Sequence, residues 1–119
     1  MEVRVVVVDD EPDLRALLRS ALPLSGIRVV GEAEDGWAAL AEVARSEPDA
    51  VVLDLRMPGL DGWDTLRQLR ESFPTTGVVI YTAEPGSAVS ARAAAFGVKV
   101  VGKSDRLAQL ADALLSGAT

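Results

Sequence analysis

Hydrophobic positions along the chain alternate between a strand spacing and a helix spacing. Short runs rich in valine predict strands, and apolar residues that recur every three or four positions predict the helices between them. The predicted strands cover residues 3–8, 27–31, 49–54, 78–82 and 98–102. The predicted apolar helix faces are Leu14, Leu17, Leu18 and Ala21; Trp37, Leu40, Ala41 and Ala44; Trp63, Leu66, Leu69 and Phe73; an alanine-rich stretch from Ser87 to Phe96; and Leu107, Leu110, Ala111 and Leu114.

This alternation predicts one α/β domain with a doubly wound, five-stranded parallel sheet. Several strand runs are apolar at every position, as expected of strands that helices cover on both faces. Trp37, Trp63 and Phe96 fall on apolar helix faces, which predicts that they pack in the core. In sheets of this kind the ligand site lies beyond the carboxyl ends of the strands. Functional side chains are therefore expected at that edge.

Composition narrows the chemistry that the domain can perform. The 119 residues include no Cys and no His, which excludes disulfides, thiolate metal sites and imidazole catalysis. The net charge is −6 and the lysines are Lys99 and Lys103, which argues against direct nucleic-acid binding. The apolar runs are no longer than a strand and the N-terminus lacks the features of a signal peptide. A cytoplasmic location away from membranes is expected.

Polar side chains follow four of the predicted strands at the edge where the site is expected. Asp9 and Asp10 follow the first strand, Asp54 ends the third, Thr82 ends the fourth and Lys103 follows the fifth. Carboxylates about 4 Å apart repel by roughly 4 kcal/mol per pair, so three together need protonation or a bound cation, and a hard divalent cation is the simpler answer. Mg²⁺ prefers such oxygen ligands and often shares them with a phosphoryl oxygen. A carboxylate neutralised in this way can accept a phosphoryl group, with a hydroxyl and an ammonium contacting the phosphoryl oxygens.

Each of these residues also has a structural explanation when it is taken alone. Asp9 and Asp10 are suitable caps for the helix that follows them. Thr82 is an ordinary β-branched strand residue, and Lys103 is an ordinary loop charge. Their convergence at one edge favours the chemical interpretation.

Together, the motifs resemble the receiver domains of bacterial response regulators over nearly the whole chain. The matching segments are Val7-Val8-Asp9-Asp10-Glu11-Pro12, the stretch from Val52 through Asp54, Met57, Pro58 and Gly59 to Gly62, Tyr81-Thr82-Ala83, and Gly102-Lys103. The resemblance implies a flavodoxin-like fold with strand order 2-1-3-4-5, a type for which a chemotaxis receiver is a known example.

The resemblance also implies a role for each residue of the predicted site. Asp54 looks like the phosphoacceptor, and Thr82 and Lys103 look like the switch hydroxyl and the phosphate-contacting lysine. Mg²⁺ would be bound by Asp9, Asp10, Asp54 and the backbone carbonyl of Arg56. The domain would thus be a regulatory switch rather than an enzyme, with only weak self-phosphorylation from small donors and self-dephosphorylation.

The partners implied are a sensor histidine kinase as phosphoryl donor, and an output. The output would be a C-terminal DNA-binding domain or a partner protein, and phosphorylation would change the conformation and could induce homodimerisation. The receiver domain is expected to cover residues 1–119. Residues 116–119 are interpreted as the possible start of a linker to an output domain outside this chain.

Three features depart from the family pattern or bear on its alternatives. Val100 occupies the position, three residues before the lysine, where the family usually has an aromatic that reports the hydroxyl movement outward. Ser104-Asp105 replaces the frequent proline after Lys103, as in receivers with LuxR-like helix-turn-helix outputs. Arg56 occupies the place where a haloacid-dehalogenase-type phosphatase requires a second aspartate, which argues against that enzyme. An adaptor that signals without phosphorylation remains the alternative function.

Arg56 and Glu84 each lie two residues beyond a predicted site residue and carry opposite charges. We expect them to meet across the mouth of the pocket. Our hypothesis is that this pair obstructs the hydrolytic water and lengthens the phosphorylated lifetime.

Overall fold

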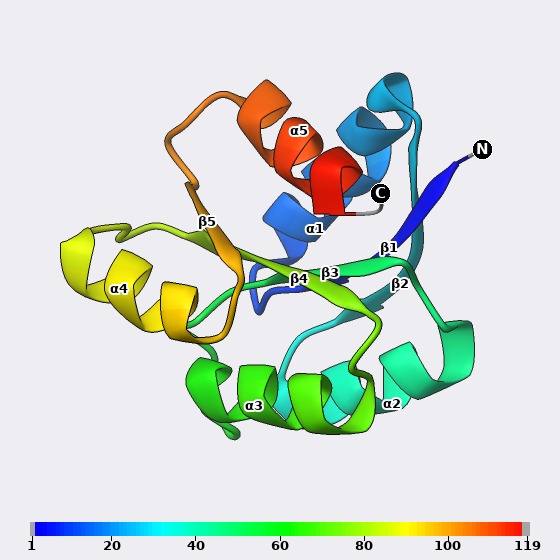
Figure 1. Cartoon of the computed structure of the whole chain (residues 1–119). Coiled ribbons are helices and arrows are strands. Elements are labelled where there is room, and N and C mark those ends of the chain that lie inside the picture. Colours follow the sequence, from blue (N-terminus) through cyan, green and yellow to red (C-terminus); the bar gives the residue numbers. More distant parts are fainter. Residues whose placement is uncertain (1, 118–119) are drawn as a thin grey trace.

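A computed structural model describes residues 2–117 as three layers, with helices on both faces of one parallel sheet (Figure 1). The strands are β1 (Val3–Val8), β2 (Ile27–Ala33), β3 (Ala50–Leu53), β4 (Gly77–Thr82) and β5 (Lys99–Gly102). They pair in the order β2-β1-β3-β4-β5, and every pair is parallel. The predicted doubly wound sheet with strand order 2-1-3-4-5 is confirmed.

Helices follow each strand and cover the two faces of the sheet. They are α1 (Pro12–Ala21), α2 (Gly36–Ser46), α3 (Gly62–Ser72), α4 (Ser87–Ala95) and α5 (Leu107–Gly117), with a short 3₁₀ helix η1 (Leu22–Ser25) after α1. In Figure 1, α1 and α5 lie on one face, and α2 and α3 lie on the other. Side-chain caps begin two of them, because the carboxylates of Asp35 and Asp61 accept backbone N–H groups at the starts of α2 and α3.

The alternation of side chains along β1 divides the core into two clusters. Val5 and Val7 pack with residues of α1 and α5, whereas Val6 and Val8 pack with residues of α2, α3 and α4. Successive side chains of a strand point to opposite faces. A strand that is apolar at consecutive positions must therefore be covered on both faces, which leaves the end of β1 and the end of β3 as the places for the carboxylates of Asp9 and Asp54.

The buried face of α2 differs from the prediction. Gly36, Ala39, Val43 and Ser46 form it, and Trp37 is 62% exposed. The cause is the close approach of α2 to α3, since a Cβ at position 36 would lie 2.2 Å from the Thr65 hydroxyl oxygen. Only small residues fit on that side of the helix, so the indole points away from it. The prediction that Trp37 packs in the core was wrong.

Smaller differences concern one side chain and the ends of some elements. Leu17 is 54% exposed because it lies about 100° around α1 from the buried Leu18. Trp63 and Phe96 pack partly buried against the core, as predicted. Ser116 and Gly117 belong to α5, and residues 118–119 lie outside the described residues, so the linker stays a prediction. Within residues 2–117, the helices are too short and too polar to span a membrane.

Candidate functional site

Backbone hydrogen bonds hold the predicted site residues just beyond the carboxyl ends of the strands. The Asp54 amide donates to the Val8 carbonyl at 3.0 Å, which continues the pairing of β3 with β1. The Lys103 amide donates to the Thr82 carbonyl at 2.7 Å, which continues the pairing of β5 with β4. The Asp9 amide is bonded in the same way to the last residue of β2 at 3.0 Å. The loops that carry the chemistry therefore begin on a rigid sheet edge.

Three carboxylates meet at this edge. One oxygen from each of Asp9, Asp10 and Asp54 lies within 4.8 Å of the others. Asp9 and Asp54 are buried, with 2% and 4% exposure, while Asp10 is exposed. Oxygen donors this close together fit a hard divalent cation, which would relieve their repulsion. The Arg56 carbonyl stays a predicted further ligand.

The ammonium of Lys103 lies among the carboxylates. Its Nζ atom is 2.7 Å from Asp9 Oδ2, 3.1 Å from Glu11 Oε1 and 3.5 Å from Asp54 Oδ2. Burial alone would lower the pKa of Lys103, but the hydrogen bond to Asp9 and the charges of Asp54 and Asp9 outweigh it and raise the pKa. The lysine therefore carries its positive charge at neutral pH.

The Asp54 carboxylate is held in one orientation by two different neighbours. Its Oδ1 atom accepts the Arg56 N–H at 3.2 Å, and its Oδ2 atom faces Lys103. Burial raises the pKa of this carboxyl, the Arg56 hydrogen bond opposes the rise, and the charge of Asp9 adds to it. The carboxylate thus has one oxygen bound to the backbone and one oxygen directed toward the Lys103 ammonium.

Thr82 ends β4 beside this cluster and is buried, with 3% exposure. Its Oγ1 atom accepts the Glu84 N–H at 3.2 Å. The hydroxyl keeps its own proton for a second acceptor, such as an anionic oxygen that enters the pocket. Because Thr82 Oγ1 is hydrogen-bonded to the Glu84 amide, a movement of the hydroxyl would displace the loop after β4.

The mouth of the pocket carries an ion pair that joins two loops. Arg56 Nη2 lies 2.5 Å from Glu84 Oε2, and the two side chains are 72% and 64% exposed. The expectation that these charges meet is confirmed. Their effect on the phosphorylated lifetime is not tested by the geometry.

Two residues that the sequence interpretation did not single out also support the site. The Arg15 guanidinium donates to the Asp9 carbonyl at 2.6 Å and is paired with Glu32, so it braces the loop after β1. Glu11 contacts Lys103 across 92 positions of sequence. Glu11 extends the acidic run of Asp9 and Asp10, but nothing in the linear pattern indicates that its side chain would reach the lysine.

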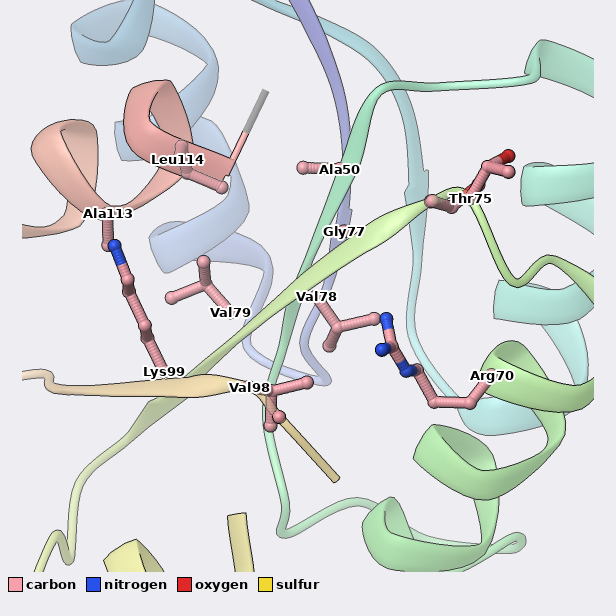
Figure 2. Close-up of a pocket in the computed structure, with 12 residues that line it drawn as sticks. Ala50, Arg70, Thr75, Gly77, Val78, Val79, Val98, Lys99, Ala113 and Leu114 are labelled. Carbon is pink, nitrogen blue, oxygen red and sulfur yellow. The ribbon is translucent and has the colours of Figure 1, made fainter. Parts of the chain in front are cut away.

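The opposite edge of the sheet also has a hollow, of about 250 Å³, near the start of β4 (Figure 2). Figure 2 shows Arg70 and Lys99 on either side of β4, with Val78 and Val79 between them. Its lining includes no carboxylate and none of the predicted site residues. The hollow is therefore separate from the carboxylate cluster.

Comparison with known proteins finds matches to one family over most of the chain. The sequence matches the profile described as response regulator receiver domain over residues 5–114. It is 42% identical over 88 residues to a protein-glutamate methylesterase/protein-glutamine glutaminase of Hahella chejuensis, covering 73% of this chain and 25% of that protein. It is 45% identical over 83 residues to the response regulator MprA of a Mycobacterium species, covering 70% of this chain and 36% of that protein. The chain thus spans about a quarter to a third of the length of these curated relatives.

Solved structures show the same likeness over nearly the whole chain. A LuxR-family two-component response regulator from Aurantimonas sp. superposes with a TM-score of 0.92 at 32% identity, covering 99% of this chain and 86% of that one. The signal receiver domain of a NarL response regulator from Mycobacterium tuberculosis gives 0.89 at 37% identity, covering 98% and 96%. The response regulator domain of Thermotoga maritima CheB gives 0.83 at 29% identity, covering 99% and 94%.

Proposed function

This chain belongs to the family of response regulator receiver domains, and we propose that it lies in the cytoplasm and accepts a phosphoryl group on Asp54 from the phosphohistidine of a sensor histidine kinase. The observation that carries the proposal is the placement of Asp54. Its carboxylate is buried at the end of the central strand β3, next to Asp9 and the Lys103 ammonium, with one oxygen directed toward that ammonium.

In the proposed reaction, the free oxygen of Asp54 attacks phosphorus. A new P–O bond forms while the P–N bond to the donor imidazole breaks, and the electron pair of that bond returns to the imidazole nitrogen. Bound Mg²⁺, held by Asp9, Asp10, Asp54 and the Arg56 carbonyl, supplies the positive charge that makes this attack between anions feasible. Lys103 neutralises the incoming phosphoryl oxygens. The Arg56 amide binds the second carboxylate oxygen of Asp54, Oδ1, and so leaves Oδ2 as the attacking atom.

We propose that Thr82 converts this reaction into a conformational signal. When its hydroxyl moves toward a phosphoryl oxygen to donate its proton, the Glu84 amide that is bonded to Oγ1 is drawn with it, and the loop of residues 83–86 follows. Phosphorylation then shifts a two-state equilibrium of this loop and of α4 behind it. Such a shift changes the surface that is presented to an output domain, a partner protein or a second copy.

The proposed output is a DNA-binding domain or a partner protein. The support is that solved structures similar to this chain include a LuxR-family regulator, and that the sequence is also similar to MprA. The chain itself carries a net charge of −6, so DNA binding would belong to the output and not to this domain. An adaptor that acts without phosphorylation is less well supported, because such a protein has no need of the buried carboxylates and the lysine together.

The test is the intact mass of the protein after incubation with acetyl phosphate and Mg²⁺. We expect wild type to gain one phosphoryl group, and we expect Asp54→Asn or added EDTA to abolish the gain. Asp64→Asn, an exposed aspartate on α3, is the matched control and should be phosphorylated like wild type. If wild type gains no phosphoryl group and also binds no beryllofluoride in the presence of Mg²⁺, the proposal is wrong and the adaptor is favoured.

A further inference from the structure

Lys103 is shared by three carboxylates, and one of them lies outside the expected metal cluster. Its nearest partners are Asp9 Oδ2 at 2.7 Å and Glu11 Oε1 at 3.1 Å, followed by Asp54 Oδ2 at 3.5 Å. Asp9 and Asp54 belong to the cluster that fits a divalent cation, and Glu11 does not. The three contacts of the lysine are therefore not equivalent.

A cation that binds this cluster must compete with the lysine. The ammonium contacts one oxygen of Asp9 and lies 3.5 Å from one oxygen of Asp54, and its side chain is only 14% exposed. Two positive ions that share the same carboxylates repel each other. Lys103 must therefore give up part of its contact with Asp9 and Asp54 when a metal binds. The free-energy cost of this change is small only if another carboxylate nearby pairs with the displaced ammonium.

Glu11 has the geometry of such a second partner. Its backbone is fixed, because its N–H donates to Asp9 Oδ1 at 2.9 Å and it immediately precedes the first residue of α1. Its side chain is 64% exposed and caps no helix N–H, so it is free to follow the lysine without disturbing the core. The contact is already formed before a metal arrives.

We propose that Glu11 is a positioning residue that receives Lys103 when Mg²⁺ binds, so that Asp9 and Asp54 become available to the metal while the lysine stays at the pocket. This inference rests on the proposed function, since it concerns the same metal and the same lysine. Without Glu11, the lysine either stays on Asp9 and Asp54 and competes with the metal, or moves into solvent. Glu11 thus promotes Mg²⁺ binding through Lys103 and not as a ligand.

The test is a double-mutant cycle with the Mg²⁺ dissociation constant as the readout. Amide shifts of the residues around Asp54 in ¹H–¹⁵N spectra, followed during titration with MgCl₂ at constant ionic strength, give Kd for each variant. We expect Glu11→Gln to raise Kd about three- to fivefold when Lys103 is present, which is the range of a partly exposed ion pair. In a Lys103→Met background, the same change should alter Kd by less than about 1.5-fold, because no ammonium is left to be received.

Glu84→Gln is the matched control. Glu84 is equally exposed at the mouth of the pocket, but it pairs with Arg56 and not with Lys103. The Glu84→Gln variant measures how much a nearby negative charge alone changes the Kd for Mg²⁺. Its effect on Kd should therefore be the same whether position 103 is lysine or methionine. Coupling to the lysine should appear for Glu11 and be absent for Glu84.

Two outcomes would overturn the inference, and they are distinguishable. If Glu11→Gln changes Kd by the same factor in both backgrounds, Glu11 acts only as a charge and the positioning role is wrong, while the proposed function stands. If wild type shows no Mg²⁺-dependent shifts at all, there is no competition to relieve, and the metal part of the proposed function fails with it.

Discussion

Replacing Asp54 by asparagine should stabilise the metal-free protein near neutral pH. Burial raises the pKa of the Asp54 carboxyl, with the Arg56 hydrogen bond acting against the rise and the charge of Asp9 adding to it. The folded protein therefore holds this proton more tightly than the unfolded chain does. Stability falls as the pH rises from the unfolded pKa near 3.8 through the folded value, and above that range the full cost of the ionised carboxylate is present.

The size of this cost follows from the neighbouring charges. The Lys103 ammonium at 3.5 Å attracts the carboxylate of Asp54 by roughly 5 kcal/mol at an effective dielectric of about 20. Asp9 and Asp10, with oxygens within 4.8 Å, each repel it by roughly 3 to 4 kcal/mol, and the share of Asp10 is reduced because it is exposed. Attraction and repulsion nearly cancel, so the main remaining contribution to the free-energy cost of the ionised Asp54 is the desolvation of its buried carboxylate. A net gain of about 1–2 kcal/mol is expected for Asp54→Asn, equivalent to roughly 3–10 °C in Tm.

Urea unfolding in EDTA would measure this gain at about pH 7.5 and at about pH 4. The advantage of Asp54→Asn should be present at the higher pH and shrink at the lower one, because the raised pKa of the wild-type carboxyl means that more of it is protonated there. Mg²⁺ should then favour wild type, because the metal needs the carboxylate. Asp64→Asn should show none of these effects. A variant that is no more stable than wild type at neutral pH, or whose gain is the same at both pH values, would refute the reasoning.

Three further changes have expected outcomes. Alanine at Arg56 or Glu84 should shorten the phosphorylated lifetime several-fold, because each removes the ion pair across the pocket mouth; unchanged dephosphorylation rates in both variants would contradict this. Gly62→Ala should lower the free energy of unfolding by about 1–3 kcal/mol in denaturant titrations, since a Cβ there would lie 2.5 Å from backbone atoms of the preceding loop. Asp35→Ala should cost ~1 kcal/mol by removing the cap of α2, whereas Asp112→Ala, at an exposed helix position, should cost almost nothing.

The sheet and its functional edge could be predicted because both depend on spacing along the chain. Runs such as residues 5–8 and 50–53 are apolar on both faces, and only a sheet covered on both faces accommodates them. The carboxyl ends of parallel strands lie at one edge, so the meeting of Asp9, Asp54 and Lys103 follows from the strand order. Strand order itself came from the family resemblance, since hydrophobic periodicity does not distinguish one order from another.

The features that escaped prediction depend on how closely elements approach and how far side chains reach. Trp37 lies on the expected helix, but the contact of Gly36 with α3 rotates the buried face toward smaller residues. Glu11 is visible as an acidic residue, but its contact with Lys103 depends on two flexible side chains from loops 92 positions apart. Such contacts require the packed structure, because a pattern of residue types has no information on rotamers.

Position 100 of β5 is a valine and so lacks the aromatic side chain that the family usually has there. Other aromatic contacts nevertheless hold α4 against its neighbours. Trp63 at the start of α3 stacks with Phe96 at the end of α4, with ring centroids 6.2 Å apart, and the Arg92 guanidinium carbon lies 4.5 Å from the Trp63 ring centroid. Val100 is partly buried against the same cluster. Contacts of this kind are worth about 0.5–1.5 kcal/mol each, so α4 cannot move relative to α3 without losing them or displacing Trp63. Because α3 directly follows the loop after Asp54, the aromatic contact of α4 in this protein leads to that loop instead of to β5.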